Sequence, residues 1–338
     1  MALPALLQHS LRLPVVAAPM FLVSGPDLVV GCCSQGVVGT FPALNQRTTA
    51  GLDAWLTAIR QRCSDIESRT QTKVAPFGVN LIVHRTNPRL QDDLDCCVRH
   101  RVPLVVTSLG AARAVTDAVH SYGGIVFHDV TTTHHARKAL DAGVDGLICV
   151  AGGAGGHAGT GSPFALIGEI RRFFSGTVLL AGALSTGRDI AAAQAMGADL
   201  GYLGTRFIAT QESLAPESYK ALIAASSAAD IVYTAVVSGI PANFLRPSLV
   251  AGGIDLRNAQ PPAHMDLGTE SALASEPDHE VGSKAKPWRD LWSAGQGVGA
   301  IDNAPSVAFL VSQLEREYQE AVTAFSAASA CYVGKSSK

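Results

Sequence analysis

A glycine-rich stretch with a single histidine is the clearest place in this sequence where chemistry could occur. Residues 151–159 read Ala-Gly-Gly-Ala-Gly-Gly-His-Ala-Gly and follow an apolar run, residues 147–150, that predicts a buried strand. Glycine lets a backbone turn tightly or lie close to a phosphate or a flat cofactor ring. A histidine titrates near neutral pH, so His157 is suited to handling a proton. A flexible glycine loop with a surface histidine is the alternative.

Further polar residues and glycine turns stand at the ends of other short apolar runs. If the runs are parallel strands of a barrel, their carboxyl ends meet at one face, where such barrels carry their active sites. The candidates at this face are Met20, Asn80, Thr107 with Ser108, His128 with Asp129, residues 152–157, Gly182 with Ala183, and Gly204 with Thr205. Each is weak evidence alone, and together they form a convergent set.

Two of these turns, residues 181–187 and 204–206, follow the last two predicted strands. In many barrels the loops after strands seven and eight hold a phosphate on backbone N–H groups and a helix N-terminus. Either turn alone would be an ordinary strand-to-helix turn. Together they predict a phosphate-bearing ligand.

The elements that must position these residues alternate between strand and helix. Eight short, continuously apolar runs are separated by amphipathic helical stretches, as expected for parallel strands buried on both faces. The predicted strands are residues 13–20, 37–41, 76–83, 104–108, 124–129, 147–150, 177–182 and 200–204. This pattern predicts an α/β fold, a (β/α)8 TIM barrel. An open, doubly wound sheet is the competitor, but no Gly-x-Gly-x-x-Gly turn follows the first strand.

The chain after the eighth strand predicts a C-terminal helical and irregular excursion. We expect residues 13–215 and 287–330 to form the barrel and its closing segment, and residues 216–286 to form a smaller inserted helical or irregular region on the substrate side. Residues 231–238 look strand-like, whereas the polar, proline-containing stretch 258–286 predicts a loose excursion over the barrel. A helix is expected from residue 306 to about 324.

Composition excludes several classes of protein. The chain has 338 residues, 47% of them hydrophobic and 16% charged, and a net charge of −2, with no long basic run that would favour nucleic acid or an anionic membrane. Seven cysteines without Cys-x-x-Cys spacing favour free thiols in a reducing compartment. Neither a signal peptide nor an apolar run of roughly 20 residues is visible. We therefore expect a cytoplasmic protein that does not bind membrane.

The remaining histidines, cysteines and tryptophans predict structural roles. No metal site is expected, because His84, His100, His134 and His135 show no grouping with carboxylates or thiols and read as surface residues. Cys149 reads as a small buried residue. We expect Trp288 and its neighbour at position 292 to pack the C-terminal segment on the barrel rather than to contact a ligand.

Several motifs, in this order and spacing, resemble the nitronate monooxygenase family, whose older name is 2-nitropropane dioxygenase. They are Pro19-Met20, Phe77-Gly-Val-Asn80, Ala154-Gly-Gly-His-Ala-Gly159, Leu180-Ala-Gly-Ala-Leu-Ser-Thr-Gly187, Gly197-Ala-Asp199, Gly204-Thr-Arg-Phe-Ile-Ala-Thr210 and Trp292-Ser-Ala-Gly-Gln296. The resemblance runs from about residue 13 to residue 299, without the 258–286 stretch. It is specific to this group of FMN barrels, but flavin-dependent enoyl-ACP reductases and NADH:quinone reductases share the framework.

The resemblance implies non-covalent FMN as the cofactor and His157 as the active-site histidine. The residues expected at the cofactor are Ala18, Met20, Asn80, Thr107, Asp129, Gly155, Gly156, Ala181, Gly182, Ala183, Gly204 and Thr205. Of these, the glycine turns after strands seven and eight would hold the phosphate, and Asn80 would bond a polar edge of the flavin. Asp129 stands where some reductase relatives carry lysine, so its contact is left open, as is the role of His128.

The implied reaction is oxidation of an alkyl nitronate by O₂ through FMN, giving a carbonyl compound and nitrite. His157 would stabilise the nitronate or, with a neutral nitroalkane, remove its α-proton. Expected partners are a small-molecule substrate and O₂, and a homodimer stays open. The alternatives are an NAD(P)H-dependent FMN reductase acting on an enoyl thioester or quinone, a non-redox aldolase or isomerase, and a catalytically silent flavin-binding protein.

Overall fold

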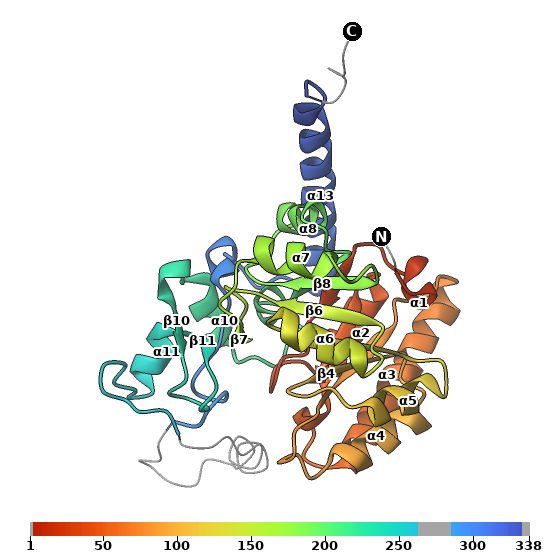
Figure 1. Cartoon of the computed structure of the whole chain (residues 1–338), viewed down its shortest axis with the longest axis horizontal. Coiled ribbons are helices and arrows are strands. Elements are labelled where there is room, and N and C mark those ends of the chain that lie inside the picture. The colour runs from red at the N-terminus through yellow and green to blue at the C-terminus, as the bar shows by residue number, and fades with distance from the viewer. Residues whose placement is uncertain (1–2, 263–284, 333–338) are drawn as a thin grey trace.

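Eight parallel strands close into a barrel in the computed structural model, which describes residues 3–262 and 285–332 (Figure 1). The barrel order is β1, β2, β3, β4, β5, β6, β8, β9, and β9 pairs back onto β1. The strands are Val15–Ala17, Val38–Pro42, Phe77–Ile82, Leu104–Ser108, Ile125–Val130, Gly146–Val150, Thr177–Ala181 and Leu200–Leu203. This confirms the predicted (β/α)8 TIM barrel.

Helices between the strands form the outer layer. They are α2 (Pro26–Ser34), α3 (Thr49–Thr70), α4 (Leu90–Arg99), α5 (Arg113–His120), α6 (Thr133–Asp141), α7 (Pro163–Arg171) and α8 (Gly187–Ala195), after a short α1 (Ala5–Gln8). Several begin at a threonine whose side chain accepts a backbone N–H of the first turn, as Thr48, Thr132 and Thr186 do. These caps fix where each helix starts above the end of its strand.

The apolar core has two layers, one on each face of the barrel wall. Side chains such as Val79 and Leu56 fill the space between strands and helices, and others such as Val106, Phe127 and Ile148 fill the barrel interior. Both sets are fully buried. This explains why the strand sequences are continuously apolar rather than alternating.

An insertion separates the eighth barrel strand from the last barrel helix. It contains α9 (Thr205–Ile208), α10 (Glu217–Ala224), β10 (Ile231–Thr234), β11 (Ala242–Leu245) and α11 (Arg246–Ala251). The strands β10 and β11 form a three-stranded antiparallel sheet with β7 (Gly156–His157), which belongs to the glycine-rich loop. The sequence predicted a strand near 231–238 but missed β11 and β7. Most of the predicted loose excursion, residues 263–284, lies outside the described residues.

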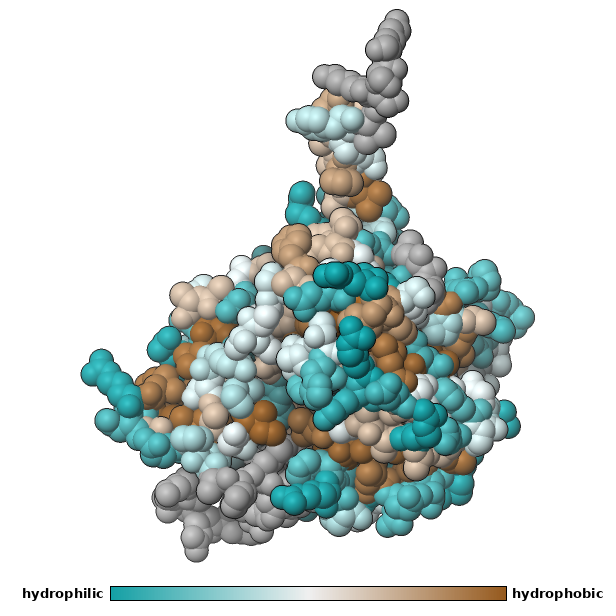
Figure 2. Space-filling view, in the orientation of Figure 1, coloured by the Kyte–Doolittle hydropathy of each residue, from teal (hydrophilic) through white to brown (hydrophobic). Residues whose placement is uncertain are grey.

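The last helix, α13 (Val307–Ser329), completes the outer layer. It packs on α8 and α2, where Val307, Leu310 and Leu314 are buried. It is longer than the predicted helix that ended near residue 324, and its C-terminal half projects away from the barrel (Figures 1 and 2). Among the described residues, no helix combines the length and apolarity that crossing a bilayer requires.

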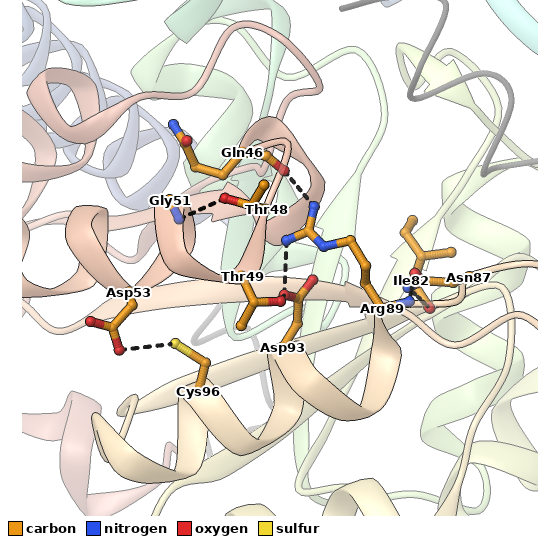
Figure 3. A network of polar contacts seen from close by, with 10 residues as sticks. All are labelled: Gln46, Thr48, Thr49, Gly51, Asp53, Ile82, Asn87, Arg89, Asp93 and Cys96. Atoms are coloured by element: carbon orange, nitrogen blue, oxygen red, sulfur yellow. Dashed lines mark hydrogen bonds and ion pairs between the residues drawn. The ribbon is translucent and has the colours of Figure 1, made fainter.

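A buried ion pair joins the start of α4 to the start of α3. Arg89 bonds Asp93 at 2.8 Å and also donates to the backbone oxygen of Gln46, while the Thr49 hydroxyl donates to Asp93 at 2.7 Å (Figure 3). The Asp93 side chain is only 1% exposed. Because breaking such a pair leaves a charge buried, this contact specifies how the two helices meet.

Candidate functional site

A cavity of about 690 Å³ opens at the carboxyl ends of the barrel strands. Strand ends and their loops form one wall, and the small sheet with the segment around Trp288 forms the other. Its size lies in the usual range for a site that binds a cofactor or a small molecule. The barrel therefore places its candidate site at the predicted end.

The structure brings almost all of the sequence-predicted site residues to this cavity. Those that line it are Ala18, Met20, Asn80, Asp129, Gly155, Gly156, His157, Ala181, Gly182, Ala183, Gly204 and Thr205. Thr107 is the exception, because its buried side chain does not line the cavity. Its hydroxyl instead lies 2.7 Å from Nδ1 of His128, which does line it.

His157 is held by the small sheet rather than by the barrel. As part of β7 it pairs with Ala242 of β11, and its Nε2 lies 3.3 Å from the hydroxyl of Ser238. The ring of Trp288 meets the imidazole edge-on, with centroids 5.2 Å apart. Burial lowers the pKa of His157 to about 4. At neutral pH this imidazole is uncharged, so it can exchange hydrogen bonds but brings no positive charge.

The glycines before His157 let two backbone segments touch. A Cβ on Gly155 would lie 2.9 Å from the backbone nitrogen of Gly295, which no real side chain tolerates. Gly156 has φ of +67°, a left-handed conformation that favours glycine. Asn243 of β11 fixes the loop from the other side by donating to the Ala154 oxygen at 2.6 Å. The run of glycine thus serves close packing as well as access to a ligand.

A polar chain crosses the opposite wall of the cavity. Asn80 on β3 donates from Nδ2 to the hydroxyl of Ser108 at 2.8 Å, and that hydroxyl donates to Oδ2 of Asp129 at 2.6 Å. Burial raises the pKa of Asp129 to about 6, against the opposing effect of the Ser108 bond. Burial also lowers the pKa of the adjacent His128 to about 4. At neutral pH this wall therefore offers an uncharged imidazole, His128, and a carboxyl group, Asp129, that is mostly ionised in the free protein.

Unpartnered polar atoms indicate where a ligand would bind. Among the described residues, five buried side-chain atoms lack a hydrogen-bond partner, and three of them, Asp129 Oδ1, Ser185 Oγ and Tyr202 Oη, belong to residues that line this cavity. Buried polar groups are normally bonded, so such a cluster favours a polar ligand. Ser185 stands in the loop after β8, beside Ala183 with φ of +56°. A phosphate at this turn would satisfy it.

Sequence reasoning missed several residues of the site. Ser185 and Tyr202 were not among the candidates, although both lie within or next to the motifs that predicted the phosphate turns. Trp288 was expected to pack the C-terminal segment, and it does pack on Phe244 and His157, but it also lines the cavity, which the sequence did not indicate. Its distance in sequence left no local signal. The other tryptophan, Trp292, stacks on a tyrosine of α10.

The expectation for His100 was wrong, whereas that for His135 was confirmed. His135 is an exposed residue of α6, and it also lines the cavity together with Lys138 of the same helix. His100 is grouped with ligand-type atoms, since its Nε2 lies 3.0 Å from Oδ1 of Asp53, and the thiol of Cys96 lies 3.7 Å from the same oxygen. A guanidinium, that of Arg99, also bonds this oxygen at 3.2 Å. This carboxylate oxygen therefore already has a cationic partner.

Comparisons with known proteins agree with this architecture. The family model described as nitronate monooxygenase matches residues 5–317. A nitronate monooxygenase of Paraburkholderia phytofirmans is 28% identical over 358 aligned positions, which cover 91% of this chain and 93% of that protein. Two other curated relatives match over only 65% and 64% of their own length.

Solved structures give the same picture for the fold. A nitroalkane oxidase of Streptomyces ansochromogenes aligns with a TM-score of 0.77 and 26% identity, over 93% of this chain and 98% of that one. FabK of Thermotoga maritima aligns with a TM-score of 0.77 and 25% identity, over 96% and 97%. Each likeness spans the barrel and the insertion together.

Proposed function

The chain belongs to the nitronate monooxygenase family, and on that premise we propose that it is an FMN-dependent oxidoreductase that oxidises alkyl nitronates with O₂. The observation that carries this proposal is a half-buried, uncharged imidazole, His157, on one wall of a cavity whose other wall holds unpartnered polar atoms. The products would be a carbonyl compound and nitrite.

The residues present fit a flavin mononucleotide. The turns at Gly182 and Gly204 with the free hydroxyl of Ser185 would hold the phosphate, and Asn80 and Asp129 would face polar atoms of the ring or its side chain. Gly156 leaves room beside them, because nothing lies within 4 Å of the position that its Cβ would take. When bound, FMN would supply the redox chemistry by which electrons move from the substrate to O₂.

His157 would orient the substrate over the cofactor. An imidazole that is neutral at pH 7 can donate one hydrogen bond to a nitronate oxygen when its Nε2 accepts from the Ser238 hydroxyl, which otherwise donates to the backbone oxygen of Ile240 at 3.3 Å. Its lowered pKa makes it a weak base with little driving force to remove a proton from carbon. We therefore favour the preformed nitronate over the neutral nitroalkane as the substrate.

The cavity wall opposite the hydrogen-bonded residues Asn80, Ser108 and Asp129 would bind the alkyl part of the substrate. Trp288, Tyr233, Ile240 and Pro241 come from the insertion and its return segment and line the cavity near His157. Aromatic and aliphatic surfaces of this kind exclude water from a reacting centre. They favour a substrate that carries an apolar chain.

Anaerobic mixing tests this proposal. Protein loaded with FMN is mixed with a nitronate and, separately, with NADH and NADPH, while the flavin absorbance is followed. Reduction by the nitronate alone, with nitrite released when air is admitted, is the expected result. His157→Gln, which keeps a polar side chain of similar size, should slow reduction by the nitronate and leave FMN bound.

The likeness to FabK favours a second candidate, a nicotinamide-dependent FMN reductase acting on an enoyl thioester or a quinone. Fast reduction by NADH or NADPH, with none by the nitronate, would replace the leading proposal by this one. A protein that remains colourless after incubation with FMN would point instead to a non-redox barrel.

A further inference from the structure

Asp129 is a half-buried residue whose carboxyl group has one inaccessible oxygen, Oδ1, left without a partner. It stands at the end of β5, where Oδ2 accepts the Ser108 hydroxyl at 2.6 Å. Oδ1 is buried and has no partner among the described residues, although the side chain lines the cavity. A buried polar atom that faces a binding cavity without a partner indicates that the ligand supplies one.

The neighbouring hydrogen bonds determine which atom of Asp129 is left for the ligand. Asn80 donates its amide hydrogens to the backbone oxygen of Val106 and to the Ser108 hydroxyl oxygen. Ser108 has a single hydrogen, and its distance of 2.6 Å to Oδ2 assigns that hydrogen to Asp129. Oδ1 is therefore the atom that either accepts from the ligand or carries a proton and donates to it.

The charges around the cavity do not favour the ionised form. In the part of the chain that the structure describes, no arginine or lysine makes an ion pair with Asp129. The titratable groups facing the cavity are His128 of β5, His135 and Lys138 of α6, His157 of β7, Tyr202 of β9, Tyr219 of α10 and Tyr233 of β10. The pKa of both His128 and His157 is lowered to about 4, so neither supplies a counter-charge at neutral pH.

A flavin in this cavity would remove the remaining water from Asp129. The pKa of the free carboxyl is already raised to about 6 by burial, and further loss of water acts in the same direction. A carboxyl group held neutral in this way becomes a hydrogen-bond donor. It would also keep a negative charge away from the place where electrons are delivered.

We propose that Asp129 carries a proton in the flavin-loaded protein and donates it in a hydrogen bond from Oδ1, so that flavin binding takes up one proton from solvent. The inference rests on the proposed function only in that the ligand is a flavin. It assigns the proton to a residue that stands where some relatives of this barrel carry a lysine cation.

The expected quantity follows from linkage. At pH 7 the carboxyl of the flavin-free protein is mostly ionised, because its pKa is about 6. Binding should then take up close to one proton per flavin, and the affinity should fall up to about tenfold per pH unit above pH 7 until the pKa of the loaded form is reached. At lower pH the uptake disappears because the group is already protonated.

Calorimetry in pairs of buffers with different ionisation enthalpies measures this uptake. Riboflavin is the first ligand, because the phosphate of FMN titrates near pH 6 and would add its own protons. Wild-type protein should take up about one proton at pH 7, and Asp129→Asn should bind riboflavin without uptake. His134→Gln, a change at an exposed position of α6 that does not line the cavity, is the matched control and should behave as wild type.

A second variant keeps the test informative if Asp129→Asn does not fold. Ser108→Ala removes the bond that favours the ionised carboxyl, so the free protein should hold its proton to higher pH and uptake at pH 7 should shrink. Riboflavin binding without proton uptake in the wild type, or with unchanged uptake in Asp129→Asn, would overturn the inference and leave the flavin site standing. Failure of both flavins to bind at any pH would overturn the proposed cofactor itself.

Discussion

Acid should destabilise the flavin-free protein through two histidines, the buried His128 and the half-buried His157. The pKa of each is lowered by burial to about 4, whereas a histidine in the unfolded chain has a pKa of about 6.5. Between pH 6.5 and pH 4 these histidines are protonated in the unfolded state but not in the folded state, so lowering the pH favours unfolding. Asp129 acts in the opposite direction, because its pKa is raised to about 6 and the folded state protonates first.

The magnitude follows from 1.36 kcal/mol per pKa unit. Between pH 7 and pH 5 each histidine should remove about 2 kcal/mol from the free energy of unfolding, and Asp129 should return about 1 kcal/mol. The three groups together therefore predict a net loss of about 2 to 3 kcal/mol. Stability from the histidines is fully present above pH 6.5 and is lost as the pH falls towards 4.

Urea unfolding at pH 7, 6 and 5 measures the effect. His157→Gln and His128→Gln should each lose about 2 kcal/mol of the pH dependence, whatever they do to stability at pH 7. His134→Gln, at an exposed position of α6, should keep the dependence of the wild type. If His157→Gln declined with pH as steeply as the wild type, the imidazole would not be held neutral by burial, and the argument that it favours a nitronate over a nitroalkane would fall with it.

Four further substitutions probe the walls of the cavity. Gly155→Ala should lower the free energy of unfolding by about 2 kcal/mol or more, because its Cβ would press on the backbone of residues 294–295. Gly156→Ala should cost only about 1–2 kcal/mol of left-handed strain, since nothing lies within 4 Å of its Cβ. Urea unfolding measures both losses. Ser185→Ala should weaken FMN binding about tenfold in a fluorescence titration but leave riboflavin unchanged, and equal losses would remove the phosphate from this turn. Trp288→Leu should raise the KM for a nitronate severalfold with FMN affinity unchanged, and an unchanged KM would place the substrate elsewhere.

The barrel was predictable because its signal is local. Each strand is a short apolar run buried on both faces, so each can be predicted from its own residues without reference to neighbouring strands. The ends of the runs then identified Asn80, Asp129 and the two glycine turns. Thr107 shows the limit, since sequence could not tell which of two adjacent residues at a strand end faces the cavity, and the structure places Ser108 there.

The wall that holds His157 was not predictable in the same way. Its strand is two residues long and lies inside a glycine run, and its partner β11 follows some 85 residues later. Pairing between two strands at that separation in the chain leaves no periodic sequence pattern from which it could be predicted. Trp288 is further still along the chain, so its contact with the imidazole could only be seen in three dimensions.

The position of α13 has a consequence for how the protein is made. The seam between β1 and β9 is lined by apolar side chains, among them Leu13, Val15 and Phe207, and α13 covers them. Its sequence comes after the whole insertion, so a ribosome completes all eight strands well before it supplies this cover. Throughout that interval these apolar side chains at the seam between β1 and β9 lack their cover. The late stage of synthesis is therefore the period when the chain most needs protection from aggregation.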